Sequence, residues 1–330
     1  MIRVGLLGLG YFARFHADAW RRVAGARLAA TADADPAAGA DHPSLAAMLE
    51  AGVDVVDIAT PPATHAEAIR AALAARPRAI VCQKPFCTSL AEAEAVTAEA
   101  ERAGIPLIVH ENFRFQPWWR AVHAALEEGA VGRPLTLTMR LRPGDGRGPN
   151  AYLARQPYFQ RMERFLIHET GVHYLDVFAW LFGRPDWVQA DLRRLNPAIA
   201  GEDAGHVLLG WRDGRRAMLD ANRLVDFDTD SPRRTFGEAT LEGEDAVVAI
   251  AGDGGVRRRA QGETGHAVLL APAERPGFAG DCVAAFCAHV VAGLEGAGFE
   301  TPARAYLDVL RLEAATYRSA DEARRIHLEW

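Results

Sequence analysis

The first 110 residues alternate short apolar runs with segments of helical periodicity. The runs are "RVGLLGLG", "RLAATAD", "VDVVDIAT", "RAIVCQ" and "PLIVHEN", and Pro, Gly or Asp bounds each of them. Apolar residues at helical spacing follow every run except the last. Strands that alternate with helices in this way indicate parallel β–α–β units. This part of the chain is therefore predicted to be a doubly wound parallel sheet.

The pattern changes from about residue 134. Alternating apolar and polar positions in "PLTLTMRLR", "WVQADLRRL", "HVLLGW" and "RAMLDANRL" are typical of an antiparallel sheet with one buried face. Helices are expected near residues 166–182 and 277–295, on one face of that sheet, and over 302–320 near the C-terminus. The fold class is therefore α/β, with a second α+β domain that holds a large, open, mostly antiparallel sheet.

Composition narrows the possible functions. The chain has 330 residues, a net charge of −6 and only scattered arginine pairs, so nucleic-acid binding is not expected. Because no apolar stretch reaches 18 residues and the N-terminus enters a strand directly, we expect neither a membrane span nor a signal peptide. The four cysteines form no CxxC pair, which favours reduced thiols in a cytoplasmic protein.

A glycine-rich turn follows the first strand. Gly8 and Gly10 permit a tight turn and the close approach of a pyrophosphate, and Tyr11 and Phe12 lead into a helix whose N-terminus can hold the phosphates. Asp33 ends the next strand, where an acid accepts hydrogen bonds from ribose hydroxyls and repels a 2′-phosphate. The motif predicts NAD rather than NADP, in a Rossmann domain over residues 1–120. Residues 121–330 are expected to form the second, α+β domain, and helix 302–320 is expected to pack back on the first domain.

Two further strands end abruptly at proline. Thr60, Pro61 and Pro62 follow "VDVVDIA", and the Lys84-Pro85 pair follows "RAIVCQ". Proline keeps the residue before it extended, so both strands should finish at the carboxyl edge of the sheet, where ligands bind in doubly wound folds. A structural turn explains each of these alone; together with the glycine-rich loop they favour a cofactor groove. His65 is expected to cap the next helix near the cofactor.

Lys84 is the only lysine among 37 lysines and arginines. Compositional bias toward arginine can leave a single lysine by chance. The alternative is chemical, since a lysine ammonium is compact and adjustable whereas a guanidinium is a broad planar fork that stays protonated. Lys84 is therefore a candidate for a proton donor in a confined pocket.

The helix expected over 166–182, "LIHETGVHYLDVFAWLF", carries three polar residues on one face. Glu169, His173 and Asp176 lie at i, i+4 and i+7 of an otherwise apolar helix. Burying such groups is costly unless they are paired or take part in chemistry. A buried histidine bonded to a carboxylate for structural reasons is the alternative to a catalytic role.

In order, the stretches "GLGYFA", "ATPPATHAEAIRAAL", "CQKP", "NFRF" and "GVHYLDVFAWLFG" resemble the Gfo/Idh/MocA family of NAD(P)-dependent oxidoreductases. The resemblance is strong over residues 1–183 and returns in "LDVLRLEAATYRSA". It implies a Rossmann domain, a larger open-sheet domain, and hydride transfer between nicotinamide and a sugar or polyol. It also implies that residues 121–330 bind the substrate and form a homodimer or homotetramer through the second sheet.

Residues of this chain match the family's functional positions. Lys84 resembles the lysine beside nicotinamide and substrate, and His173 the catalytic histidine, a general base. Glu169 occupies the place where several members carry a catalytic aspartate, and Asp176 matches the acid after the histidine. His173, Arg114, Asp176 and Lys84 are the implied substrate contacts.

Asn112 matches a position at the nicotinamide end of the cofactor. Gln83, also implied in cofactor binding, departs from the family because it replaces the usual glutamate of the Glu-Lys-Pro motif. The amide keeps the hydrogen-bonding shape but loses the charge.

The predicted function is NAD-dependent dehydrogenation of a carbohydrate hydroxyl. "CQKP", "VHENFRFQ" and the "GED" at 201–203 resemble most a branch that oxidises apiose, which suggests the anomeric carbon of an aldose. A non-catalytic metabolite sensor and an NAD-dependent glycosidase are the alternatives, although the Gly-His-His stretch usual in such glycosidases is absent. No metal is expected, because there is no HExxH or Cys/His spacing.

Overall fold

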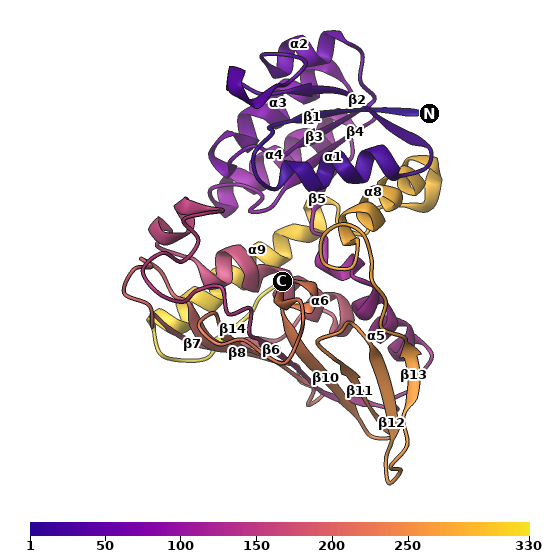
Figure 1. The fold of residues 1–330 in the computed structure, drawn as a ribbon, viewed down its shortest axis with the longest axis vertical. Coiled ribbons are helices and arrows are strands. Elements are labelled where there is room, and N and C mark those ends of the chain that lie inside the picture. The colour runs from indigo at the N-terminus through magenta and orange to yellow at the C-terminus, as the bar shows by residue number, and fades with distance from the viewer. The chain divides into compact units, whose positions relative to one another are not determined.

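The computed structural model describes residues 1–330, which form two compact units. Unit 1 comprises residues 1–112 and 281–308, and unit 2 comprises residues 113–280 and 309–330. None of the helices is both long and apolar enough to cross a lipid bilayer. Each unit is built around one sheet, in agreement with the predicted fold class (Figure 1).

Unit 1 holds the predicted parallel sheet in the order β2-β1-β3-β4-β5. Its strands are β1 (Ile2–Leu7), β2 (Ala26–Ala32), β3 (Val55–Ile58), β4 (Ala79–Gln83) and β5 (Leu107–His110). All residues of β3, β4 and β5 are buried, as a sheet covered on both faces requires. The order reverses beside β1, so the strand ends at β1 and β3 border the crevice where such folds bind ligands.

Helices cover both faces of this sheet. They are α1 (Ala13–Arg22), α2 (Leu45–Glu50), α3 (His65–Ala75), α4 (Leu90–Ala103) and α8 (Cys282–Ala292), with short turns η1 (Pro36–Ala38), η2 (Pro62–Thr64) and η6 (Gly293–Ala297). Helix α1 packs against α8, while α3 contacts both α2 and α4 (Figure 1). The α2 segment has only six residues, which fits the short stretch between the second and third apolar runs.

Unit 2 holds a nine-stranded sheet in the order β13-β12-β11-β10-β6-β9-β8-β7-β14. The strands are β6 (Pro134–Leu141), β7 (Trp187–Arg193), β8 (Ala204–Gly210), β9 (Arg216–Asn222), β10 (Gly237–Gly243), β11 (Ala246–Ile250), β12 (Val256–Ala260), β13 (Ala267–Leu270) and β14 (Ile326–His327). All pairs are antiparallel except β6 with β9, which run parallel. Burial alternates along β9 and β10, so one face is apolar and covered.

Helices of unit 2 supply that cover. They are α5 (Pro117–Glu127), α6 (Val172–Phe182), α7 (Pro232–Thr235) and most of α9 (Ala303–Asp321), whose first six residues belong to unit 1, with turns η3 (Phe113–Phe115), η4 (Pro157–Arg161) and η5 (Leu166–Gly171). Helix α5 lies against β12 and β13 and also contacts α6 (Figure 1). The expected helix at 166–182 is interrupted: its first six residues form the π-helical turn η5.

The pairing of β10 with β6 depends on Gly237. Its φ is +152°, and a Cβ built there would lie 1.9 Å from the Arg140 carbonyl oxygen. Gly237→Ala is expected to lower the free energy of unfolding by about 3 kcal/mol, because it adds backbone strain to a steric clash. Urea unfolding followed by tryptophan fluorescence measures this, since every tryptophan except Trp20 lies in unit 2.

The matched control is Gly262→Ala. Gly262 also has a positive φ, of +76°, but an added Cβ would meet nothing within 4 Å. Gly262→Ala should lower the free energy of unfolding by about 1 kcal/mol. Equal losses in the two variants would contradict the steric argument.

Candidate active site

The glycine-rich loop of unit 1 is shaped by its first glycine. Gly8 has a φ of +90°, and a Cβ there would lie 2.9 Å from the Thr60 backbone nitrogen. Only glycine therefore lets the ends of β1 and β3 approach this closely. A Cβ at Gly10 would meet no atom within 4 Å, and no side chain caps the N-terminus of α1 at Phe12. A helix N-terminus behind an open glycine turn can hold a pyrophosphate.

Asp33 lies directly after β2 and is bonded to this loop. Its Oδ2 accepts the Leu9 backbone N–H at 2.7 Å, and its Oδ1 accepts that of Asp35 at 2.8 Å. The carboxylate is half-buried, so it keeps a side open to solvent. The acid expected at the ribose is thus anchored to the loop that would hold the phosphates.

His65 joins the two proline-ended strands. Its Nε2 lies 2.7 Å from the Thr60 carbonyl oxygen and its Nδ1 lies 3.1 Å from that of Phe86. Burial lowers the pKa of His65, although both carbonyls oppose the shift. A neutral ring has one N–H, so it can donate to only one of these two carbonyls at a time. The expected capping role of His65 is wrong, because His65 is the first residue of α3 and no side chain caps that helix at Thr64. Its buried ring instead lies between the two strand ends.

Two further groups lie near the strand ends of unit 1. Oε1 of Gln83 accepts the Lys84 backbone N–H at 2.7 Å. The Asn112 side-chain oxygen is buried and meets no donor in the protein. An orphaned buried acceptor costs free energy unless a ligand supplies a donor. This acceptor, the glycine cradle at Gly8 and the anchored Asp33 fit a bound dinucleotide.

The three polar residues expected on helix 166–182 begin in a π-helical turn. Glu169 lies in η5, whereas His173 and Asp176 lie in α6. Because π and α geometry differ in residues per turn, the spacing between Glu169 and His173 departs from the regular α-helical register. Such π turns occur frequently at functional sites.

Neighbouring residues orient His173 and Asp176. The His173 ring is 6% exposed and stacks on Phe113 at 3.9 Å between centroids, with the planes 3° apart. Arg114, the next residue, binds Asp176 through two parallel hydrogen bonds from Nε and a terminal nitrogen. The "NFRF" motif therefore packs on one polar residue of α6 and pairs with another. Bidentate pairs of this kind fix geometry as well as charge.

Arg223, at the end of β9, is a site residue that the sequence reasoning missed. It is 2% exposed and binds Asp145 through two nitrogens at 3.1 and 3.2 Å. Its third nitrogen donates to Thr170 at 2.8 Å and to Glu169 at 3.2 Å. Burial by itself would raise the pKa of Asp145, but Arg223 and Arg155 hold it below the ordinary value. No spacing rule links these residues, because they lie on separate segments.

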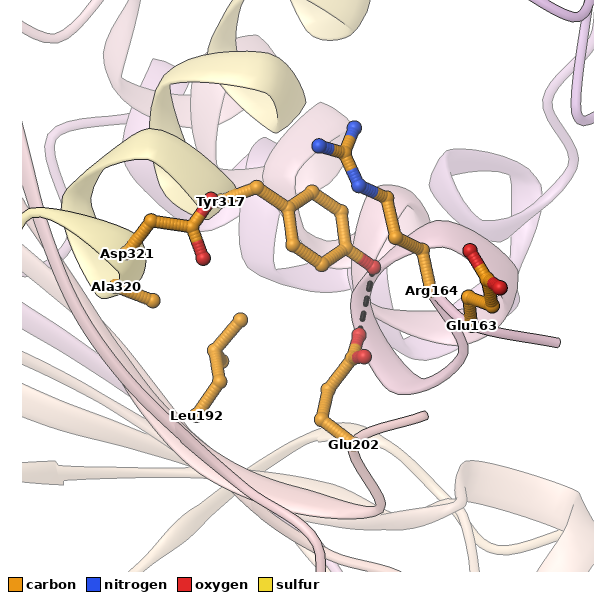
Figure 2. A pocket seen from close by; sticks show the side chains of 7 residues that line it. All are labelled: Glu163, Arg164, Leu192, Glu202, Tyr317, Ala320 and Asp321. Atoms are coloured by element: carbon orange, nitrogen blue, oxygen red, sulfur yellow. Dashed lines mark hydrogen bonds between the residues drawn. The ribbon is translucent and has the colours of Figure 1, made fainter. Parts of the chain in front are cut away.

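Glu202 binds the backbone at the start of the π-helical turn η5. Its carboxylate accepts the backbone N–H groups of Phe165 and Ile167 at 3.2 and 3.1 Å, and the Tyr317 hydroxyl at 2.6 Å. That hydroxyl oxygen in turn accepts the backbone N–H of His168 at 3.1 Å. Figure 2 shows Tyr317 and Glu202 meeting in a pocket that is also lined by Glu163, Arg164, Leu192, Ala320 and Asp321. A Cβ at Gly201 would lie 2.6 Å from the Met162 carbonyl oxygen, so the residue before Glu202 packs closely against that backbone.

The sequence-predicted residues divide between the units. Unit 1 carries Gly8, Gly10, Tyr11, Phe12, Asp33, Thr60, Pro61, Pro62, His65, Gln83, Lys84 and Asn112, and unit 2 carries Arg114, Glu169, His173 and Asp176. The predicted cofactor residues of unit 1 therefore gather at the carboxyl ends of β1 to β5. The predicted acid–base and substrate residues of unit 2, apart from Arg114 in η3, lie on η5 and α6.

Two family models match the chain. The model described as "Oxidoreductase family, NAD-binding Rossmann fold" matches residues 2–111, and "GFO/IDH/MocA C-terminal domain" matches residues 119–249. Together they match more than half of the chain and fall on the two sheets described above.

Similar proteins extend over nearly the whole chain. D-apiose dehydrogenase of Paraburkholderia graminis is 36% identical, covering 98% of this chain and 89% of that protein. D-apiose dehydrogenase of Rhizobium rhizogenes is 32% identical, covering 99% and 97%. The crystal structure of an oxidoreductase from Agrobacterium radiobacter with NAD+, L-tartaric acid and magnesium is 31% identical, covers 99% and 98%, and superimposes with a TM-score of 0.88.

The buried cation of Arg223 generates a prediction for stability. Arg223→Met leaves Glu169 and part of the charge of Asp145 uncompensated inside unit 2. The free energy of unfolding should fall by about 3 kcal/mol, the cost of breaking a buried ion pair from one side. The midpoint of urea unfolding measures it.

Arg212→Met is the control, because Arg212 pairs with Asp186 but its side chain is 90% exposed. That change should stay within about 0.5 kcal/mol. An Arg223→Met variant as stable as this control would show that the buried cluster does not depend on its cation.

Proposed function

This chain belongs to the Gfo/Idh/MocA family of NAD-binding oxidoreductases and is an NAD-dependent dehydrogenase of the sugar and polyol type, and on that premise we propose that it oxidises an aldose such as apiose at the anomeric carbon. The observation that carries the proposal is the similarity to two proteins named D-apiose dehydrogenase over nearly their whole lengths. The chain keeps a lysine and a histidine at the family's two reactive positions, Lys84 and His173.

Groups of unit 1 would hold the cofactor. Gly8, Gly10 and the N-terminus of α1 would bind the pyrophosphate, and Asp33 the adenosine ribose. The buried oxygen of Asn112 would take a donor at the nicotinamide end. Bound NAD supplies the acceptor for the hydride that leaves the sugar carbon.

His173 would act as the general base. An imidazole titrates near neutral pH, so it can accept the hydroxyl proton while the carbon is oxidised. The stack on Phe113 restrains the ring plane, which supports a fixed direction for proton transfer. Glu169, which Arg223 and Thr170 hold in place, would stabilise the imidazolium that forms.

Lys84 would contact the substrate oxygen. Its ammonium can donate a hydrogen bond to that oxygen and stabilise the negative charge that develops as the proton leaves. Arg114 and Asp176, bonded to each other in the structure, would bind hydroxyl groups of the sugar through their remaining donors and acceptors.

The test of the proposed function is a substrate panel. Purified protein is mixed with NAD and with apiose, other aldoses, polyols and aryl glycosides, and NADH formation and glycoside cleavage are both followed. A dehydrogenase accumulates NADH with one or a few sugars, and Lys84→Ala should lower turnover by about 10² to 10³-fold. Tight NAD binding without turnover would favour the metabolite sensor, and cleavage without net NADH the glycosidase.

Lys84→Arg tests why a lysine is needed. The charge is retained, but the larger planar head should displace the substrate, and a shift of about 1 Å can cost about 10²-fold in rate. We expect kcat/KM for the best sugar to fall by about that factor. Circular dichroism and thermal unfolding control for folding. A variant with near-normal turnover would show that any cation suffices at position 84.

A further inference from the structure

A row of buried polar side chains in unit 1 extends from β3 and α1 to the end of β4, next to Lys84. His16 on α1 and Asp57 on β3 are 0% exposed, and Gln83 at the end of β4 is 8% exposed. His16 and Asp57 have no part in the site proposed above. Buried polar groups of this kind are costly, so their arrangement calls for a reason.

The contacts form one continuous chain. Oδ2 of Asp57 lies 2.8 Å from His16 Nδ1 and also accepts Trp20 Nε1–H at 2.7 Å. His16 Nε2 lies 3.1 Å from Gln83 Nε2. Gln83 Oε1 accepts the Lys84 backbone N–H at 2.7 Å. The side chains of Asp57, His16 and Gln83, from β3, α1 and β4, thus connect a buried carboxylate to the backbone of Lys84.

The donor and acceptor at every link follow from the two ends. The Lys84 N–H is a fixed donor, so the Gln83 atom that it meets must be the amide oxygen. The other amide atom is then the NH₂ group, a donor, and His16 Nε2 must accept from it. The His16 proton is therefore on Nδ1, where it donates to the Asp57 carboxylate. No link conflicts with this assignment.

A second imidazole and two thiols lie beside the His16–Asp57 pair. His110 on β5 stacks on the His16 ring at 4.0 Å between centroids. The thiols of Cys82 and Cys287 lie near Asp57, and burial raises the pKa of both well above the usual value, so they stay uncharged. His16 and Trp20 both bond to Oδ2 of Asp57, whereas its buried Oδ1 has no hydrogen-bond partner.

We propose that Asp57, His16 and Gln83 form a one-way hydrogen-bond relay that keeps His16 as the neutral Nδ1–H tautomer and holds the Lys84 backbone through the Gln83 amide oxygen. His16 and Asp57 are positioning residues, which act on Lys84 only through Gln83. Their effect on turnover rests on the proposed function, whereas the direction of the relay does not.

The relay also explains what the glutamine does. A carboxylate at position 83 would still accept the Lys84 N–H, but its other oxygen would face His16 Nε2 and accept rather than donate. To bond to both carboxylates, His16 would then have to carry a proton on Nδ1, facing Asp57, and a second one on Nε2, facing residue 83. Gln83 therefore sets the charge of a buried histidine, and with it the number of charges in the row.

The direct test is the tautomer of His16 in the full chain. Long-range proton–nitrogen correlation spectra of ¹⁵N-histidine-labelled protein distinguish the two tautomers and the cation, and His16→Gln assigns the signal. At pH 7 we expect a proton on Nδ1 and none on Nε2. A proton on Nε2, alone or with one on Nδ1, would overturn the relay.

Gln83→Glu supplies the second spectrum. His16 should become doubly protonated at pH 7, whereas Gln189→Glu, the same change on an exposed position of β7, should leave its signals unchanged. A neutral His16 in Gln83→Glu would overturn the claim that residue 83 sets its charge.

Kinetics then test the positioning role. Gln83→Met keeps the side-chain size but loses both hydrogen bonds, and His16→Phe keeps the stack on His110 but loses the relay. Both should lower kcat at least tenfold and change the sugar KM by less than threefold, and Gln83→Glu should lose less than Gln83→Met because it keeps the acceptor. Wild-type kcat in Gln83→Met would overturn the positioning role. Because the spectra need no substrate, failure to find a sugar would refute the proposed function and leave the relay decided by the tautomer.

Discussion

A charged group that leaves water must be paired inside the protein, and this requirement organises the polar residues of both units. In unit 1 the Asp57 carboxylate takes donors from His16 and Trp20. In unit 2 the Glu202 carboxylate takes two backbone N–H groups and the Tyr317 hydroxyl, and Arg223 joins Asp145 to Glu169. Each cluster reaches one of the predicted reactive residues or the turn that carries it.

These clusters give the site its rigidity. The π-helical turn η5 lacks the regular hydrogen bonding of α6, and Glu202 and Tyr317 satisfy backbone N–H groups at its beginning. The Phe113 ring and the Arg114–Asp176 pair then hold the polar face of α6. A catalytic group is useful only when its neighbours hold it to within a fraction of an ångström, so these supporting contacts matter as much as the reactive atoms.

Much of the fold was predictable because it rests on local periodicity. Alternating strands and helices indicated the parallel sheet, and two-residue alternation indicated the second sheet, both of which the structure confirms. The helix expected at 166–182 was only partly right, since residues 166–171 form a π-helical turn. A π turn has no distinct apolar period in six residues, and the side-chain contact at its start comes from Glu202, 35 residues beyond Ile167 in the chain.

By itself, the sequence determined the sheet of each unit, the glycine turn at Gly8 and the family, because these depend on short motifs and on the spacing of apolar residues. Only the tertiary structure decided that residues 281–308 join unit 1, that Arg223 pairs with Glu169, and that His16 and Asp57 stand behind Gln83. The reason is physical: the pairing of buried polar groups depends on which strands and helices the chain brings together, and no local pattern encodes that.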